Sequence, residues 1–144
     1  MAALFLGCKK NKFETKPKLV IKSVTPSVVP PEGNAVITFE FFDKEGDVDS
    51  VITMVRRRIN QRPATVSTRT TFPFVVPQFP DRSSGEIEVF LDKDNHLKMS
   101  QPPPANPNSP TGRESDTLLL KFVIADKGKN VSDTVSTQIV VMRR

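Results

Sequence analysis

The chain of 144 residues has no tryptophan or tyrosine, a single cysteine (Cys8) and a single histidine (His96). One cysteine excludes an intrachain disulfide and a cysteine-based zinc cluster. Without tryptophan and tyrosine, the chain lacks the aromatic platforms that commonly stack nucleic-acid bases and sugars. Cys8 lies outside the body of the chain, His96 lies in a polar Asp-Asn-His segment, and no Gly-rich phosphate-binding loop occurs. The composition therefore predicts a protein that is not an enzyme and that binds neither nucleic acid nor glycans.

Long apolar runs are also absent. No segment approaches the roughly 18–20 apolar residues that a membrane-spanning helix needs. The chain instead has 13 prolines and a series of short β-branched segments. This pattern predicts strands joined by turns, and the length is most simply that of one domain with a single core.

The net charge of +5 is concentrated near the N-terminus. Five lysines and one glutamate lie within residues 9–18, so this segment carries +4 and the rest of the chain only +1. The high pI is therefore a property of residues 9–18, which we interpret as a lysine-rich tether. Such a tether can attract an anionic lipid surface within a Debye length, or it can be a solvated spacer.

Alternation of apolar and polar residues predicts the strands. The seven expected strands are residues 19–24, 35–42, 48–59, 71–76, 86–91, 117–125 and 131–142. The residues expected to face the core in the most regular strand are Ala35, Ile37, Phe39 and Phe41. Strand 117–125 is the most apolar and is expected at a sheet centre, whereas Pro73 restricts its strand to a sheet edge. The pattern predicts an all-β fold, namely a two-sheet antiparallel β-sandwich of about seven strands.

Three further segments carry specific expectations. In a strand, Arg56 and Arg58 share one face and Arg57 takes the other, and we expect these arginines on a solvated face or guarding a sheet edge. Phenylalanines in residues 72–80 are expected to fill the core from an edge strand, or alternatively to form an exposed docking strip. Residues 92–115 are rich in Asn, Pro and Ser, and we expect them to be extended and mobile.

The N-terminal residues Phe5-Leu6-Gly7-Cys8, followed at once by lysines, resemble the lipobox of exported bacterial lipoproteins. The resemblance implies that Cys8 is lipidated, with a membrane anchor at that residue. Residues 1–8 are then the remnant of a longer signal, because they lack the basic segment and the roughly 7–15 apolar residues of a full export signal. The expected organisation is this remnant, a tether at 9–18 and one domain at 19–144. The alternative is a frayed N-terminus with an incidental cysteine.

Two polar turns resemble those of bacterial Ig-like and cadherin-like modules. They are Phe41–Val48 (FFDKEGDV) and Ile124–Ser132 (IADKGKNVS). The resemblance implies an Ig-like sandwich in which the two turns lie at the same end. The cysteine pair, core tryptophan and corner tyrosine of antibody domains are missing.

The two acidic turns form a candidate calcium site. Calcium takes six to eight oxygen ligands, often from acidic loops. The candidate ligands are Asp43, Asp47, Asp49, Asp126 and Asp133. The alternative is that these aspartates only shape turns by bonding their own backbone.

We therefore expect a lipid-anchored binding or spacer module without catalytic activity, located in a bacterial cell envelope and facing the periplasm or the cell surface. Its membrane contact is the lipid on Cys8, and its partner is another protein. Two alternatives stay open. One is a calcium-dependent adhesion-type or structural Ig-like module, and the other is an accessory domain of an envelope polysaccharide-processing system. Calcium is the only cofactor considered.

Overall fold

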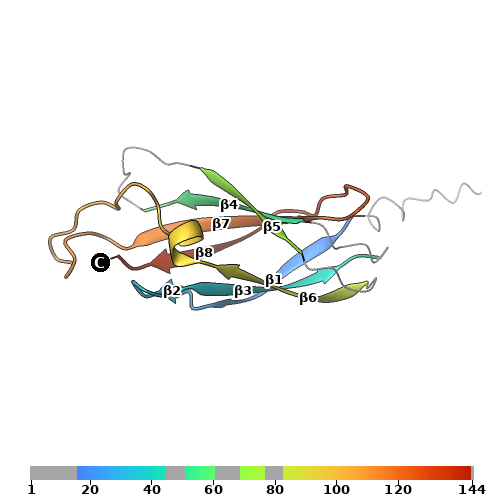
Figure 1. Cartoon of the computed structure of the whole chain (residues 1–144), viewed down its shortest axis with the longest axis horizontal. Helices are drawn as coiled ribbons and strands as arrows, with labels where there is room; N and C mark the ends of the chain where they lie inside the picture. Colours follow the sequence, from blue (N-terminus) through green and yellow to red (C-terminus); the bar gives the residue numbers. More distant parts are fainter. Residues whose placement is uncertain (1–15, 45–50, 61–68, 77–82, 144) are drawn as a thin grey trace, which may run out of the picture.

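The computed structural model describes residues 16–44, 51–60, 69–76 and 83–143. These residues form eight strands and one single-turn π-helix (Figure 1). The elements are β1 (Lys18–Thr25), β2 (Val28–Val29), β3 (Ala35–Phe42), β4 (Val51–Arg58), β5 (Thr70–Val75), β6 (Ser84–Leu91), η1 (Lys93–Leu97), β7 (Asp116–Ala125) and β8 (Val135–Val141). The prediction of an all-β fold is confirmed.

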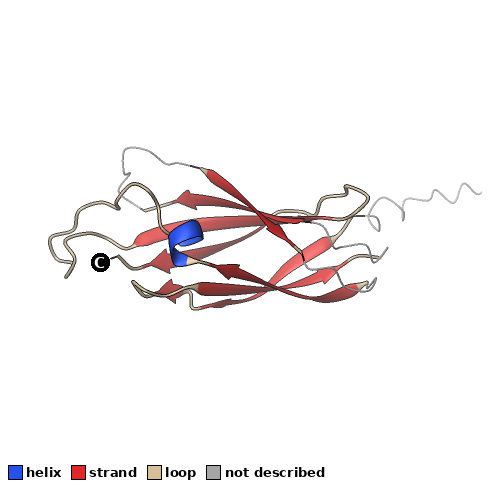
Figure 2. Ribbon diagram, viewed as in Figure 1, coloured by secondary structure: helices blue, strands red, loops and turns tan. Residues whose placement is uncertain are grey.

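The strands form two sheets that run along the long axis of the molecule (Figure 2). One sheet has the order β1-β3-β6, and the other has the order β2-β8-β7-β4-β5. All neighbouring strands are antiparallel except β2 and β8, which are parallel. The chain crosses from the first sheet to the second between β1 and β2, where the Thr25–Pro26 peptide bond is cis.

The hydrophobic core lies between the sheets and follows the period of two expected for strands. Most of its largest fully buried side chains come from alternate positions of β3, β4 and β7. The rings of Phe39 and Phe122 meet across the two sheets at 4.9 Å, edge to face. As predicted, the four alternate residues of strand 35–42 are buried, β7 is central in its sheet, and Pro73 lies on the edge strand β5.

The number and bounds of the strands differ from the prediction of about seven. The additional strand is β2, whose two residues lie between prolines and are too short to show any periodicity. The last strand begins at Val135, whereas Val131 makes only an isolated bridge to Ala125. The hydroxyl of Ser132 accepts the amide proton of Ile124 instead, so this turn extends further into the expected strand.

Residues 92–115 also differ from the expectation of an extended, mobile segment. Asp92 caps η1 by accepting hydrogen bonds from the amides of Asp94 and Asn95. Leu97 and Met99 are buried in the main core. Ala105 and Arg113 form an antiparallel bridge that folds the rest of the segment back on itself. Buried apolar side chains and hydrogen bonds hold this segment against the two sheets. Its polar composition gives no indication of these contacts.

Candidate functional site

The inner face of β4 carries two arginines that were expected in solvent. Arg56 and Arg58 are each only 6% exposed. They are in phase with the buried Ile52 and Met54 and point between the sheets. The expectation of a solvated or edge-guarding face is therefore wrong for these two residues, since β4 lies inside its sheet between β5 and β7.

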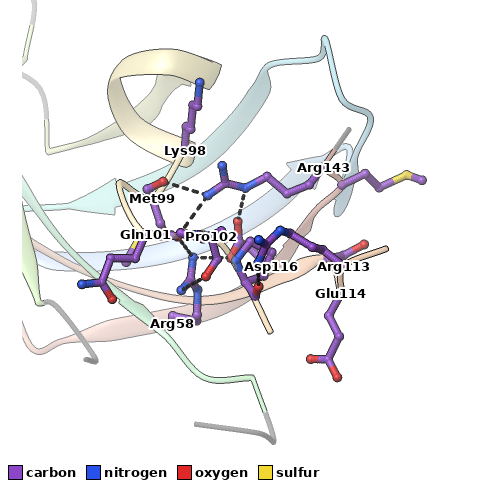
Figure 3. A network of polar contacts seen from close by, with 12 residues as sticks. Arg58, Lys98, Met99, Gln101, Pro102, Arg113, Glu114, Asp116 and Arg143 are labelled. Carbon is purple, nitrogen blue, oxygen red and sulfur yellow. Dashed lines mark hydrogen bonds and ion pairs between the residues drawn. The ribbon is translucent and has the colours of Figure 1, made fainter. Parts of the chain in front are cut away.

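Asp116 is the counter-charge for this buried group. The Arg58 Nη2 atom lies 2.6 Å from Asp116 Oδ1, and Arg143 Nε lies 2.7 Å from Asp116 Oδ2. Figure 3 shows both guanidinium groups converging on the carboxylate, which is fully buried. The same two arginines also donate to backbone carbonyls, Arg143 to Met99 at 2.8 Å and Arg58 to Pro102 at 3.3 Å. The network ties residues 99–102 to both central and C-terminal strands, which is a structural role.

Arg56 forms a second contact group beside this network. Its guanidinium donates to the carbonyl of His96 and lies 4.9 Å from the ring centre of Phe72. The His96 ring lies 5.5 Å from Phe72 and 5.0 Å from Phe74. Both phenylalanines pack against the core, which confirms the core-filling interpretation for these two residues.

The surroundings of His96 shift its pKa. Burial lowers its pKa below the ordinary value, and the nearby Arg56 charge lowers it further, while Asp92 partly opposes both. The Nδ1 atom accepts the backbone amide proton of Asp92 at 2.9 Å. His96 thus belongs to the polar single turn η1 and at the same time packs its ring against Phe72 and Phe74.

The predicted calcium ligands that lie in the described ranges differ in their burial and in their hydrogen-bond partners. The carboxylate of Asp126 accepts hydrogen bonds from the backbone and side-chain amides of Asn130, at 2.8 and 3.0 Å. Asp43 is buried, and its backbone amide donates to Ser83. The Asp133 side chain is 89% exposed and pairs with Lys16.

Asp43 and Asp126 nevertheless lie at the same end of the molecule. Phe42 pairs with Lys18 at the start of β1, and Lys16 reaches the β7–β8 turn through Asp133 (Figure 1). Asp47 and Asp49 lie outside the described residues. Within the described ranges no three acidic, histidine or cysteine side chains are grouped to hold a metal. The calcium site stays a prediction, and the Asp126 contacts are those of a turn former.

Cys8 and residues 9–15 of the tether also lie outside the described residues, so lipidation stays a prediction. β1 begins at Lys18, one residue before the expected domain start. None of the helical structure in the described chain is long and apolar enough to cross a membrane.

A groove of about 680 Å³ opens between β1 and β8. β1 pairs only with β3, and on the side away from β7 the strand β8 pairs only with the two residues of β2, so the edges that face the groove are mostly without a neighbouring strand. Its floor includes Leu19, Ile21 and Val135, and Lys16 and Asp133 lie at its rim. Pockets that fix a small ligand usually combine an apolar lining with several converging polar groups. This groove has the apolar lining, but its rim charges are already paired with each other.

The outer face of the five-stranded sheet presents a group of partly exposed apolar side chains. Its outward positions on β4 and β7 are mainly Val, Thr, Leu and Ala. Val75, on the edge strand β5, is 83% exposed. Arg57, Arg69 and Lys121 lie on the same face, around a hollow of about 80 Å³. The sequence analysis did not predict that these three cations are neighbours, because Lys121 lies far along the chain from the two arginines.

Neither a protein-family model nor a curated protein sequence matches the chain. Among solved structures, the chain is similar to the Pseudomonas fluorescens alkylpurine DNA glycosylase AlkC bound to DNA with an abasic-site analogue, at 8% identity and a TM-score of 0.46. That match covers 92% of this chain and 33% of the glycosylase, so the chain spans about a third of its length.

A Niemann-Pick type C2 protein from the Japanese carpenter ant is similar at 11% identity and a TM-score of 0.43, over 87% of this chain and 89% of that protein. A Listeria innocua beta-glucosidase in complex with gluconolactone is similar at 10% identity and a TM-score of 0.41, over 88% of this chain and 16% of the enzyme. At these TM-scores and identities, the likenesses assign neither a family nor an activity.

Proposed function

We propose that the chain is a lipid-anchored module of a bacterial cell envelope, with an immunoglobulin-like sandwich that contacts another protein and performs no catalysis. Cys8 carries the lipid, the lysine-rich residues that follow form the tether, and the domain faces the periplasm or the cell surface. The lipobox-like Leu6-Gly7-Cys8 supports the anchor. Only nine residues separate Cys8 from Lys18, where the first strand begins.

The strand order supports the immunoglobulin-like assignment. In immunoglobulin notation, strands A, B and E share one sheet, and G, F, C and C′ share the other. The orders β1-β3-β6 and β8-β7-β4-β5 match these two sets when β2 is set apart and the other strands are lettered A, B, C, C′, E, F and G in chain order. The parallel strand β2 then extends the second sheet beside G.

The observation that carries the binding role is the exposed outer face of the five-stranded sheet. Contiguous exposed apolar surface on a soluble domain commonly marks an interaction site. The cross-strand rows at one end of this face are almost wholly apolar, as in Val75–Val51–Ala125. The inner side of the same strands is filled by the domain's own core, so this outer side is the one free to meet a partner.

Anchoring is tested by fractionation of the full-length protein with its natural leader. We expect the wild type in the membrane fraction, labelled by a metabolically incorporated fatty acid, and Cys8→Ala in the soluble fraction without label. A Cys8→Ala variant that stays in the membrane fraction would contradict the anchor. Both proteins keep the lysines of residues 9–18, so a difference between them is due to Cys8 and not to the charge of the tether.

The contact surface is tested by a photo-crosslinking amino acid in the same full-length protein. Placed at Thr53, which points outward from β4, the probe should form one discrete adduct in intact cells. Placed at Thr38, which points outward from β3 in the other sheet, it should form none. Equal adducts at both positions, or none at either, would contradict a partner on the five-stranded face.

A calcium-dependent module is the second candidate, because Asp43 and Asp126 are buried acidic residues at one end of the molecule. A metal that binds only the folded state raises its stability. Melting in EDTA, then with calcium, then with magnesium, distinguishes the candidates. A calcium-specific rise of the Tm that is lost in Asp43→Asn would favour this candidate, and an unchanged Tm would leave the aspartates as turn formers.

A further inference from the structure

Two of the basic side chains on the outer face come from the neighbouring strands β4 and β7, and the third, Arg69, comes from the residue just before β5. Arg57 of β4 pairs with Leu119 of β7, and Val55 of β4 pairs with Lys121. Arg69 directly precedes Thr70, which pairs with Arg56, so the register continues to place Arg69 beside Arg57. Cations that are separated by as many as 64 positions in the sequence therefore become neighbours on one sheet.

The basic residues surround a hollow with an apolar floor. Its volume is about 80 Å³, and Val55 and Leu119 contribute the apolar part of its lining. This space suits a single small side chain and is too small for a sugar ring or a nucleobase. The rows beyond the hollow, Pro73–Thr53–Val123 and Val75–Val51–Ala125, are apolar or hydroxyl-bearing. The face thus has a cationic half and an apolar half.

In the described strands, no acidic residue lies on the face that carries these cations. Within the described ranges, the outward positions of β4, β5, β7 and β8 include no aspartate or glutamate. No ion pair joins Arg57, Arg69 or Lys121 to any carboxylate in the described chain. On the other sheet, by contrast, Lys22 pairs with Glu40 and Glu86. Like charges gathered without a counter-charge raise the free energy of the isolated domain, and a partner carboxylate would lower it.

We propose that this hollow, on the face that the proposed function assigns to a partner protein, receives a glutamate or aspartate side chain of an acidic partner segment. The carboxylate contacts Arg57, Arg69 and Lys121, and apolar residues flanking it in the partner cover Val51, Val123 and Val75. The inference rests on the proposed function and adds the chemistry of the partner. Complementary charge of this kind gives an interface both its orientation and a faster association rate.

The surroundings favour a protein over other anions and over a second copy. Nucleic-acid surfaces combine basic grooves with stacking aromatic side chains, and no outward position of β4, β5, β7 or β8 in the described ranges is aromatic. A polyanion also gains little from the apolar half of the face. In a symmetric pair of these faces, the three cations of one copy would oppose the like charges of the other.

The test uses the full-length chain, labelled with ¹⁵N and titrated with a synthetic acetylated Val-Glu-Val-Glu-Val amide. Amide resonances of Val55, Arg57, Leu119 and Lys121 should shift with added peptide. A matched peptide with glutamine in place of glutamate should leave them unchanged. Binding should weaken about tenfold or more in Arg57→Glu, because a like charge now faces the carboxylate. Raising the salt concentration should weaken binding as well.

Two controls make the outcome decisive. Lys22→Glu reverses a cation on the other sheet and should bind the peptide as the wild type does, while thermal melts verify that both variants are folded. Equal binding of the glutamine peptide, shifts confined to other surfaces, or no binding would overturn the inference. Stronger shifts of the same residues with dextran sulfate or oligothymidylate would overturn the protein assignment. A charge-independent adduct at Thr53 would overturn the inference and leave the proposed function standing.

Discussion

Arg57 and Arg58 are consecutive in the chain and have opposite surroundings. Arg58 points between the sheets, is 6% exposed and forms an ion pair with the fully buried Asp116. Arg57 points outward, next to Arg69 and Lys121, on a face without acidic residues in the described strands. The pleat of one strand therefore separates a cation that holds the fold together from one that is available to a partner.

The two surroundings have different energetic consequences. Removing one partner from a buried ion pair leaves a charge with no compensation, which costs far more than the pair itself contributes. Changing an exposed side chain without partners alters stability little. The inner face of β4 should thus control folding, and its outer face should control binding.

The largest expected effect comes from Asp116→Ala. This change leaves Arg58 and Arg143 without their buried counter-charge and should lower the free energy of unfolding by about 3–5 kcal/mol. Chemical denaturation measures it. Asp133→Ala is the matched control, because the Asp133 side chain is 89% exposed, and its effect should be within about 0.5 kcal/mol. Similar losses in both variants would contradict the structural role of the network.

The direct comparison is Arg58→Ala against Arg57→Ala. We expect Arg58→Ala to lose about 1.5–3 kcal/mol, because the ion pair with Asp116 and the charged hydrogen bond to the carbonyl of Pro102 disappear. Arg57→Ala should change stability by no more than about 0.5 kcal/mol. Denaturation curves of the two variants under one set of conditions decide the matter. The inverse ranking would mean that the two faces of β4 have been assigned the wrong way round.

A smaller effect is expected from the protonation of His96. Its pKa is lowered from 6.5 in the folded chain, by burial and then by Arg56. The unfolded chain therefore binds the proton of His96 more readily. The contribution of His96 to stability is constant above pH 6.5 and falls as the pH drops below that value. His96→Gln removes this dependence. The test compares the Tm difference between wild type and variant at pH 7.5 and at pH 5.5, and an unchanged difference would contradict the argument.

The smallest effect is expected at the paired cation of the three-stranded sheet. Lys22 pairs with Glu40 and Glu86 in solvent, and exposed ion pairs contribute little to stability. Lys22→Ala should leave the Tm unchanged within the precision of calorimetry. A clear drop in the Tm would show that the ion pairs of Lys22 on the outer face of the three-stranded sheet contribute to stability, which would contradict this prediction.

Much of the architecture was predictable, because burial in a two-sheet fold imposes a period of two on each strand. The buried residues Ile37, Phe39 and Phe41 were identified in this way, as were the central position of β7 and the edge position of Pro73. The strand β2 was missed, since two residues show no period. Residues 92–115 were misjudged, because their order depends on the burial of Leu97 and Met99 and on hydrogen bonds with distant arginines.

The candidate site was less accessible from the sequence. Arg56 and Arg58 are in phase with the apolar residues Ile52 and Met54, and this phase was a signal that the arginines are buried. The same holds for Asp116, in phase with Leu118 and Leu120. The prediction instead followed the general rule that charged residues are exposed. Nothing local indicates that Lys121 lies near Arg57 and Arg69, because that proximity depends on the pairing of β7 with β4.

The sequence by itself determined the all-β class, most of the strands and their buried faces, because these depend on alternation between near neighbours in the chain. It also supplies the lipobox-like residues around Cys8 and the lysine-rich tether, which remain predictions. Only the tertiary structure decided that Arg58, Asp116 and Arg143 form one network, and that three distant cations share one hollow. The physical reason is that strand order and register bring together residues separated by long stretches of chain, and these pairings leave no local pattern in the sequence.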